Sequence, residues 1–182
     1  MKKLLLFAAL ISVSFFAKAQ STTYKAFKVD VDFGYAIPSD GTGTKAGATF
    51  TIEPHYRLAD EFAIGLRFEG AALGYENNVD KNAKVSLLTS YCATGEYYFM
   101  KSGFRPFVGG GLGLFAQKAV AADGSSGTTT TVKASATEFG AFPRIGFEAG
   151  HFRMAATYDV LGNNASYTSF TVGFFLGGGS KK

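Results

Sequence analysis

Apolar and polar residues alternate along most of this chain with a period of two. From Phe27 to Ile37 the odd positions are all apolar, whereas the even positions hold lysine, aspartate, glycine and alanine. Strict alternation of this kind predicts a β-strand with one apolar and one polar face. The stretch from Ala48 to Leu58 repeats the pattern with opposite parity, so it predicts a second strand of the same type.

Six further segments follow the same rule, less cleanly where glycine is frequent. They are Phe62–Ala72, Val85–Phe99, Phe104–Ala116, Phe139–Ala149, Met154–Val160 and Phe170–Leu176. We therefore expect eight strands. Beyond residue 19 no run of about 18 apolar residues occurs, so any insertion into a membrane must use strands rather than helices.

Charged residues in the predicted strands all fall on the face opposite the large apolar side chains. A water-soluble barrel or sandwich shows the reverse arrangement, with few charges inside. Because no second apolar layer or helix is predicted to cover the phenylalanine-rich face, that face needs lipid. The charges and one histidine should then form an ion-pair network inside the closed sheet, made by Lys28, Asp30, Asp32, Glu53, His55, Arg57, Arg67, Glu69, Glu96, Arg105, Arg144, Glu148 and Asp159.

Long and short connections alternate between the predicted strands. In an even-stranded barrel all long loops then lie at one end, with the short turns and both termini at the other, as in outer-membrane barrels with extracellular loops and periplasmic turns. We therefore predict an all-β fold, an eight-stranded antiparallel up-and-down transmembrane β-barrel. The long links are Pro38–Lys45, Glu76–Lys84, Lys118–Thr137 and Leu161–Tyr167; the short ones lie around Ala59–Glu61, Lys101–Gly103 and His151–Phe152.

The turns also predict which charges face each other. A turn centred on Asp60 places Glu53 opposite Arg67, and a two-residue turn at His151–Phe152 places Arg144 opposite Asp159. Eight strands leave a lumen that side chains can fill, so we expect a closed interior with no open pore.

Residues 1–19 have the features of a cleaved signal peptide. Lys2 and Lys3 precede an apolar stretch, Leu4–Phe16, and Ala17-Lys18-Ala19 forms a small-x-small cleavage site. We expect export to the cell outer membrane and a single barrel domain over residues 20–182.

The charge balance changes when the leader is set aside. Three of the 18 basic residues and none of the 14 acidic ones lie in residues 1–19. The barrel domain is therefore nearly neutral, which argues against nucleic acid as a partner. The single cysteine, Cys92, cannot form an internal disulfide, so stability must come from sheet pairing or packing.

Residues that suggest chemistry have simpler interpretations here. His55 lies between Glu53 and Arg57 on the inner face, where we expect it to join the lumen network rather than act in catalysis. His151 lies in a predicted turn, and two histidines with one cysteine give no metal-ligand spacing. We expect no metal, no cofactor and no catalytic residue.

Three further features are candidate sites. Gly109–Gly113 continues a strand instead of opening a helix, so it relieves crowding in the lumen rather than cradling phosphate. Cys92 points inward and is expected to be a packed thiol. The loop Ala121–Thr137, rich in serine and threonine, is either a surface for adhesion or recognition or a solvated loop without a partner.

The chain resembles the small outer-membrane β-barrel family, the OmpA/OmpX-like group of eight-stranded barrels. The resemblance is carried by Ala17–Gln20, Arg105–Gly113, Pro143–Gly150 and the last strand, Tyr167–Gly177, and it covers nearly all of residues 20–182. The resemblance implies that the protein lies in the cell envelope, but it does not imply one role, because some members of such families anchor, some adhere and others stabilise the envelope. The terminal Gly177–Lys182 departs from the terminal aromatic residue typical of the family.

Three functions compete at this stage. The first is a non-enzymatic envelope barrel, a monomer, with outer-membrane lipid as its surroundings and its loops facing an extracellular partner. The second is a lipocalin-like cup that binds an apolar ligand inside the barrel, which would require an uncharged interior. The third, a lipid-modifying enzyme, would require clustered histidine, serine and carboxylate near a membrane interface, and the sequence indicates no such cluster.

Overall fold

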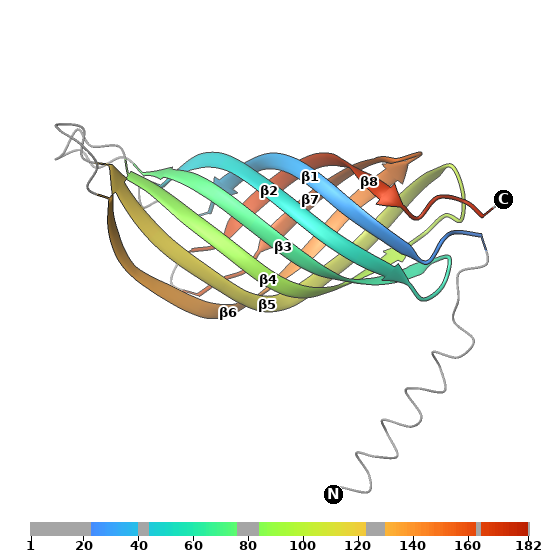
Figure 1. The fold of residues 1–182 in the computed structure, drawn as a ribbon, viewed down its shortest axis with the longest axis horizontal. Helices are drawn as coiled ribbons and strands as arrows, with labels where there is room; N and C mark the ends of the chain where they lie inside the picture. Colours follow the sequence, from blue (N-terminus) through green and yellow to red (C-terminus); the bar gives the residue numbers. More distant parts are fainter. Residues whose placement is uncertain (1–22, 40–43, 76–83, 123–129, 163–164, 182) are drawn as a thin grey trace, which may run out of the picture.

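The computed structural model describes residues 23–39, 44–75, 84–122, 130–162 and 165–181, so the predicted signal peptide lies outside the described residues. The fold is a closed barrel in which each strand pairs antiparallel with the next and β8 pairs with β1 (Figure 1). The predicted fold class is confirmed. Among the described residues, no helix is long and apolar enough to cross a membrane. The strands are β1 (Phe27–Pro38), β2 (Thr44–Arg57), β3 (Phe62–Tyr75), β4 (Lys84–Tyr98), β5 (Phe104–Ala122), β6 (Thr130–Ala149), β7 (Phe152–Asp159) and β8 (Tyr167–Gly177).

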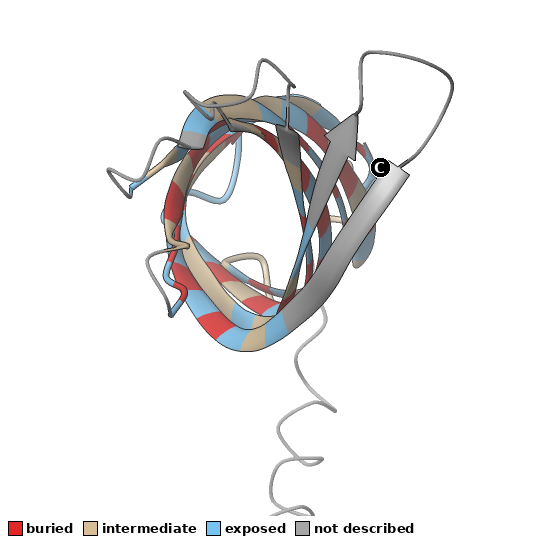
Figure 2. Cartoon of the chain, turned by 90° about the vertical axis from the view of Figure 1, so that its left-hand side faces the viewer, coloured by how far each residue is buried: buried red, intermediate tan, exposed pale blue. Residues whose placement is uncertain are grey.

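Side chains alternate between the two faces of the sheet, and the apolar row faces outward. Phe33 is 57% exposed, whereas the adjacent Asp32 is only 3% exposed. Successive side chains of a strand point to opposite faces, so the same contrast recurs along each strand, where buried and exposed bands alternate (Figure 2). The apolar residues form the outer wall of the barrel, and the charged residues lie in its lumen.

The β5–β6 hairpin is longer than the sequence pattern predicted. Lys118–Thr137 was expected to be a loop, but β5 continues to Ala122 and β6 starts at Thr130, with paired residues in between. Threonine and valine favour extended backbone, and their pairing partners are present across the hairpin, which explains the extension. The tip, residues 123–129, lies outside the described residues.

The β6–β7 turn differs from the predicted one. Ala149 pairs with Phe152, so the turn residues are Gly150 and His151, and Gly150 has a φ of 63°. Glycine adopts this left-handed conformation without steric cost, which favours the turn at this position. As a result Arg144 faces Thr157, and the predicted pairing of Arg144 with Asp159 was wrong.

The β2–β3 register agrees with the prediction, although the expected ion pair does not form. Ile52 pairs with Phe68, so the next positions, Glu53 and Arg67, face each other. Arg67 pairs with Glu69 of its own strand and with Asp159 of β7, and Glu53 pairs with Arg144 of β6. Backbone register and side-chain pairing are therefore separate features of this lumen.

The interior has two chemically different halves. Buried side chains toward the short turns are mostly charged, and we call this part the ionic half. Toward the long loops lies an apolar half, which the sequence analysis did not anticipate, since it predicted ion pairs throughout. The apolar half is the buried cluster Ala36, Ala71, Leu73, Leu88, Cys92, Phe115, Phe142, Leu161 and Tyr167.

Both ends of the described chain meet beyond the short turns. The backbone N–H of Lys25 donates to the carbonyl of Gly179 at 2.9 Å, and that of Lys181 donates to Thr23 at 2.8 Å. Gly177 and Gly178 have positive φ values of 76° and 62°, a conformation that glycine permits. These bonds extend the β1–β8 pair past the end of the barrel.

Candidate functional site

The structure places all thirteen residues of the predicted lumen network inside the barrel. None of them is more than 6% exposed. They come from seven of the eight strands, β1 to β7, and the contribution of β7 is Asp159, which lies 3.0 Å from Arg67 of β3. A buried charge is costly unless it is paired, so the geometry of the pairs determines what this site can do.

Arg153, at the start of β7, is the network residue that the sequence analysis missed. It is fully buried, and its guanidinium lies 3.0 Å from Glu148, 3.3 Å from Asp30, and in direct contact with Glu96. Its position, six residues before the inward Asp159, has the same parity, so the period of two was the signal available. Arg153 was missed because the turn was predicted at His151–Phe152, so the strand was expected to begin only at Met154.

Glu148 is the acceptor that links the cations of the short-turn end. Its carboxylate contacts Lys28 directly, accepts from the Tyr98 hydroxyl at 2.8 Å, and lies 3.3 Å from Arg57 and 3.5 Å from Arg105. A carboxylate has enough lone pairs to accept from several donors at once. With Arg153, which lies 3.0 Å away, one glutamate therefore joins cations from four strands.

A second group lies nearer the middle of the lumen. Arg144 donates from both terminal nitrogens to Glu53, at 2.6 and 2.8 Å, and also lies 3.0 Å from Glu96. The Thr94 hydroxyl donates to Glu53 at 2.6 Å. Paired arginine–carboxylate bonds of this kind are directional, so they fix the relative positions of β2, β4 and β6.

A third group borders the apolar half. Arg67 lies 3.0 Å from Asp159 and in direct contact with Glu69. Glu69 also accepts from the hydroxyls of Thr51, at 3.2 Å, and Tyr167. These contacts join β3 to β7 and β8 across the lumen.

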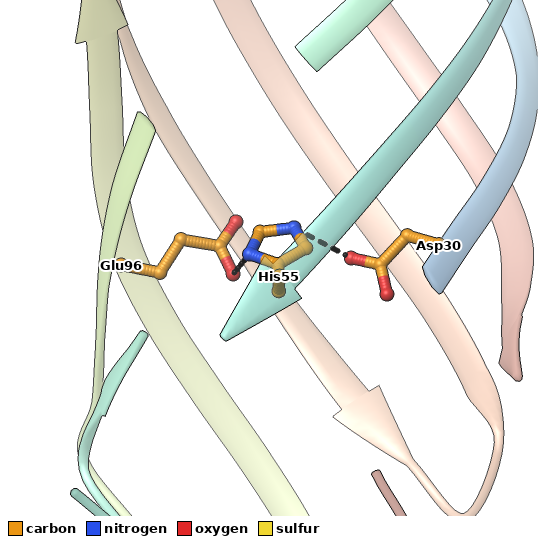
Figure 3. A group of neighbouring side chains, drawn as sticks. All are labelled: Asp30, His55 and Glu96. Atoms are coloured by element: carbon orange, nitrogen blue, oxygen red, sulfur yellow. Dashed lines mark ion pairs between the residues drawn. The ribbon is translucent and has the colours of Figure 1, made fainter. Parts of the chain in front are cut away.

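His55 lies among three buried carboxylates, two of which, Asp30 and Glu96, are drawn in Figure 3. Its Nε2 is 3.0 Å from Asp30 and 3.2 Å from Glu53, and its Nδ1 is 3.9 Å from Glu96. Among the residues whose burial the structure describes, the other buried charges are seven carboxylates and six lysine or arginine cations, so a protonated His55 would balance the network. This environment suits an imidazolium.

The same cluster brings together groups that could ligate a metal ion. Donor atoms of Asp30, His55 and Glu96 lie within 4.8 Å of one another, which is close enough for a shared ion. However, the Asp30 carboxylate is also 3.0 Å from Lys28 and 3.3 Å from Arg153, and Arg153 contacts Glu96. The carboxylates are already neutralised by fixed cations, which a divalent ion would have to displace. The donor set therefore does not fit a metal.

Aromatic rings complete the ionic half, a feature that the charge pattern could not reveal. The guanidinium of Arg153 lies 4.2 Å from the ring centre of Phe107, and that of Arg105 lies 4.2 Å from that of Tyr98. Arg67 lies 4.2 Å from the Phe142 ring, which belongs to the apolar half. Desolvated cation–π contacts of this type contribute on the order of 2 kcal/mol each.

The family described as outer membrane protein beta-barrel domain matches residues 4–181 of this chain. The chain belongs to this family. It is therefore an outer-membrane barrel, and its exposed apolar wall contacts membrane lipid. A comparison with curated proteins finds no match.

Solved outer-membrane barrels have the same fold. Ail of Yersinia pestis, in complex with the heparin analogue sucrose octasulfate, has a TM-score of 0.58 and 15% identity, covering 84% of this chain and 100% of Ail. Neisserial surface protein A has a TM-score of 0.58 and 17% identity, covering 85% and 98%. OprG of Pseudomonas aeruginosa has a TM-score of 0.50 and 17% identity, covering 87% and 98%. Identities this low show a shared fold and nothing more specific.

An exposed ion pair lies outside the barrel of this outer-membrane protein, between two short turns. Lys101 donates to Glu61 at 2.7 Å, and the Lys101 side chain is 67% exposed. This hydrogen bond lowers the pKa of Glu61 below its ordinary value and raises the pKa of Lys101. Because water screens both groups, the pair contributes far less to stability than its buried counterparts.

A cavity of about 340 Å³ at the short-turn end brings Ser102, Glu148, His151 and Ser180 to one place. A hydrolytic site would need these groups to be connected. Instead, Glu148 is engaged by the buried cations, and the His151 ring stacks on Phe175 at 5.2 Å. In the described part of the chain, no hydrogen bond joins the His151 ring to a hydroxyl or carboxylate.

Proposed function

We propose that this protein is a non-enzymatic outer-membrane barrel with a closed lumen, and that its long loops serve a structural or surface-interaction role. The observation that carries the proposal is the fully buried charge network. Its side chains reach across the lumen and contact residues of distant strands, as in the bonds from Arg144 to Glu53 and from Arg153 to Glu96.

The apolar half supports closure independently. A Cβ added at Gly140 would collide with Leu161 and lie 2.9 Å from the Phe115 ring. At Gly111 it would lie 2.7 Å from the Phe142 ring. Large side chains therefore cover the inward glycines, and they fill space that an eight-stranded barrel could otherwise leave open.

Conductance in planar bilayers tests closure. The purified protein should give no steady large conductance under conditions in which a porin, reconstituted in parallel, gives open channels. Folded insertion is verified by heat-modifiable mobility on gels. Steady large conductance from folded protein would refute the closed lumen.

The orientation of the barrel is part of the proposal. The C-terminus lies at the same end as the short connections (Figure 1), which in our proposal is the periplasmic end. An epitope inserted after Gly124 should bind antibody on intact cells, whereas the same epitope after Ser102 should bind only after the outer membrane is opened. The opposite labelling would invert the orientation.

We further propose that residues 1–19 are removed during export and that residues 20–182 form the mature monomer. N-terminal sequencing of protein from outer membranes should then begin at Gln20. Recovery of protein that retains Met1 would contradict cleavage.

A lipocalin-like cup is the second candidate, because the apolar half of the lumen has the lining, although not the open space, that an apolar ligand needs. If the apolar half opens to admit a ligand, an apolar fluorescent fatty acid should bind the folded protein, and Leu161→Asp should weaken that binding. Binding that saturates at one ligand per barrel would support the cup. Absence of saturable binding would leave the closed barrel as the function.

A further inference from the structure

The lipid-facing wall of the barrel contains an elongated groove near the short turns. Two neighbouring hollows of about 500 and 230 Å³ lie on the outer face of β5 to β8. Both are lined by Ile145 and Ala156, so they adjoin one another. We call the two together the wall groove.

A small residue in a row of large ones produces the wall groove. Val108 pairs with Ile145, Ile145 with Ala156, and Ala156 with Phe170, which places the four outward side chains in one row across four strands. Val108, Ile145 and Phe170 are large and 41%, 62% and 54% exposed. Alanine at position 156 leaves the gap between them.

An aromatic rim borders the wall groove toward the short turns. The rings of Phe104 and Phe147 lie 4.9 Å apart, and both residues line the larger hollow, as does Phe99. Aromatic residues at the end of an outer-membrane barrel lie at the level of the lipid headgroups. The wall groove therefore runs from a headgroup region into the hydrocarbon.

We propose that the wall groove binds one acyl chain of a phospholipid. The groove is apolar and elongated, and it faces a solvent made of such chains. The turn between Phe99 and Phe104, next to the aromatic rim, carries Lys101, whose 67% exposed side chain donates to Glu61 of the β2–β3 turn at 2.7 Å. A lysine there attracts the phosphate, and the adjacent carboxylate suits the ammonium of a zwitterionic headgroup. The choice of phospholipid rests on the proposed orientation, which puts this end in the periplasmic leaflet.

Two matched substitutions test the wall groove. Ala156→Phe fills it, whereas Ala93→Phe places the same ring at another exposed position of the outer wall, on β4. Refolded protein is incubated with phosphatidylethanolamine, and retained lipid is counted by native mass spectrometry. Retention by Ala156→Phe should fall roughly tenfold, which corresponds to about 1.4 kcal/mol of binding free energy. Ala93→Phe should retain lipid as the unchanged protein does.

Further measurements decide between occupants. Heat-modifiable mobility verifies folding, and Ala156→Val replaces the phenylalanine variant if that one does not fold. Lys101→Gln should weaken retention of phosphatidylethanolamine and leave retention of a diacylglycerol unchanged.

Three outcomes would each overturn the proposal: equal lipid retention by all proteins, retention of lipopolysaccharide in place of phospholipid, or paired barrels that dissociate in Ala156→Phe. Because conductance does not depend on this wall, a failure here leaves the closed-lumen proposal standing.

Discussion

The two halves of the lumen are lined by the same alternating strand positions but are filled by opposite chemistries. In the ionic half, Arg144 reaches Glu53 through two short bonds, although the residues are 91 positions apart in sequence. In the apolar half, the Phe115 ring lies over Gly140. Ion pairs determine which strands meet, because each bond has a direction and a partner. Apolar packing determines how closely they approach, because it depends on volume alone.

Substitutions should therefore destabilise the two halves of the lumen for different reasons. Removing one partner from the ionic half leaves an uncompensated buried charge, and removing volume from the apolar half leaves a cavity. Adding volume is the sharper test of the apolar half, because its inward glycines already lie under large side chains. The following predictions compare the two halves by these routes.

The largest effect is expected for Glu148→Gln in the ionic half. Glutamine keeps the shape but removes the charge that Lys28, Arg153 and Arg57 share. We expect the free energy of unfolding to fall by about 3–5 kcal/mol, the usual cost of breaking a buried ion pair. Urea unfolding from lipid vesicles, followed by gel mobility, measures it. If Glu148→Gln lowers the free energy of unfolding no more than the removal of an exposed charge does, the two halves do not differ in the way described here.

A smaller effect is expected for Gly140→Ala in the apolar half. The added methyl would collide with Leu161 and lie 2.9 Å from Phe115. Overpacking of this kind costs about 1–3 kcal/mol. Gly70→Ala is the matched control, because a Cβ there meets nothing within 4 Å. If both variants unfold at the same urea concentration, the apolar half is loosely packed and the cup becomes the better function.

The period of two was sufficient to predict which residues face inward, because alternation is a local property of extended backbone. It did not predict their partners. Glu53 faces Arg67 in the β2–β3 register yet bonds to Arg144, since long side chains reach across a closed barrel to strands that are not neighbours. Arg153 was missed for a different reason: the predicted turn was placed beyond Gly150, the residue whose positive φ sets the actual turn.

The apolar half could not be predicted from alternation alone. Phe142 faces Gly111 across the β5–β6 pair, and Phe115 lies over Gly140, which is diagonal to it in the same pair; both glycines leave room for the rings. That complementarity depends on cross-strand register and side-chain volume, neither of which appears in a single strand. Counting inward glycines against inward phenylalanines was the available signal.

His55 gives a third test, within the ionic half. We expect both ring nitrogens to carry protons near neutral pH, because carboxylates of Asp30, Glu53 and Glu96 surround the ring. Nitrogen NMR shifts of labelled histidine report this directly. His55→Gln should lower the free energy of unfolding by about 1–2 kcal/mol, the scale of a hydrogen bond to a charged group. A neutral ring in the spectrum would mean that the network carries a net negative charge.

The smallest effect is expected where the same kind of ion pair lies in water. The hydrogen bond from Lys101 lowers the pKa of Glu61, so Lys101→Gln should raise that pKa toward its ordinary value of 4.5. Since the folded pKa is below the unfolded one, any stabilisation is present above the unfolded pKa and is lost as pH falls through the folded pKa. Carboxyl NMR titration should detect the shift, while urea unfolding near neutral pH should not change measurably. A destabilisation comparable to that of Glu148→Gln would show that burial is not what separates the two kinds of pair.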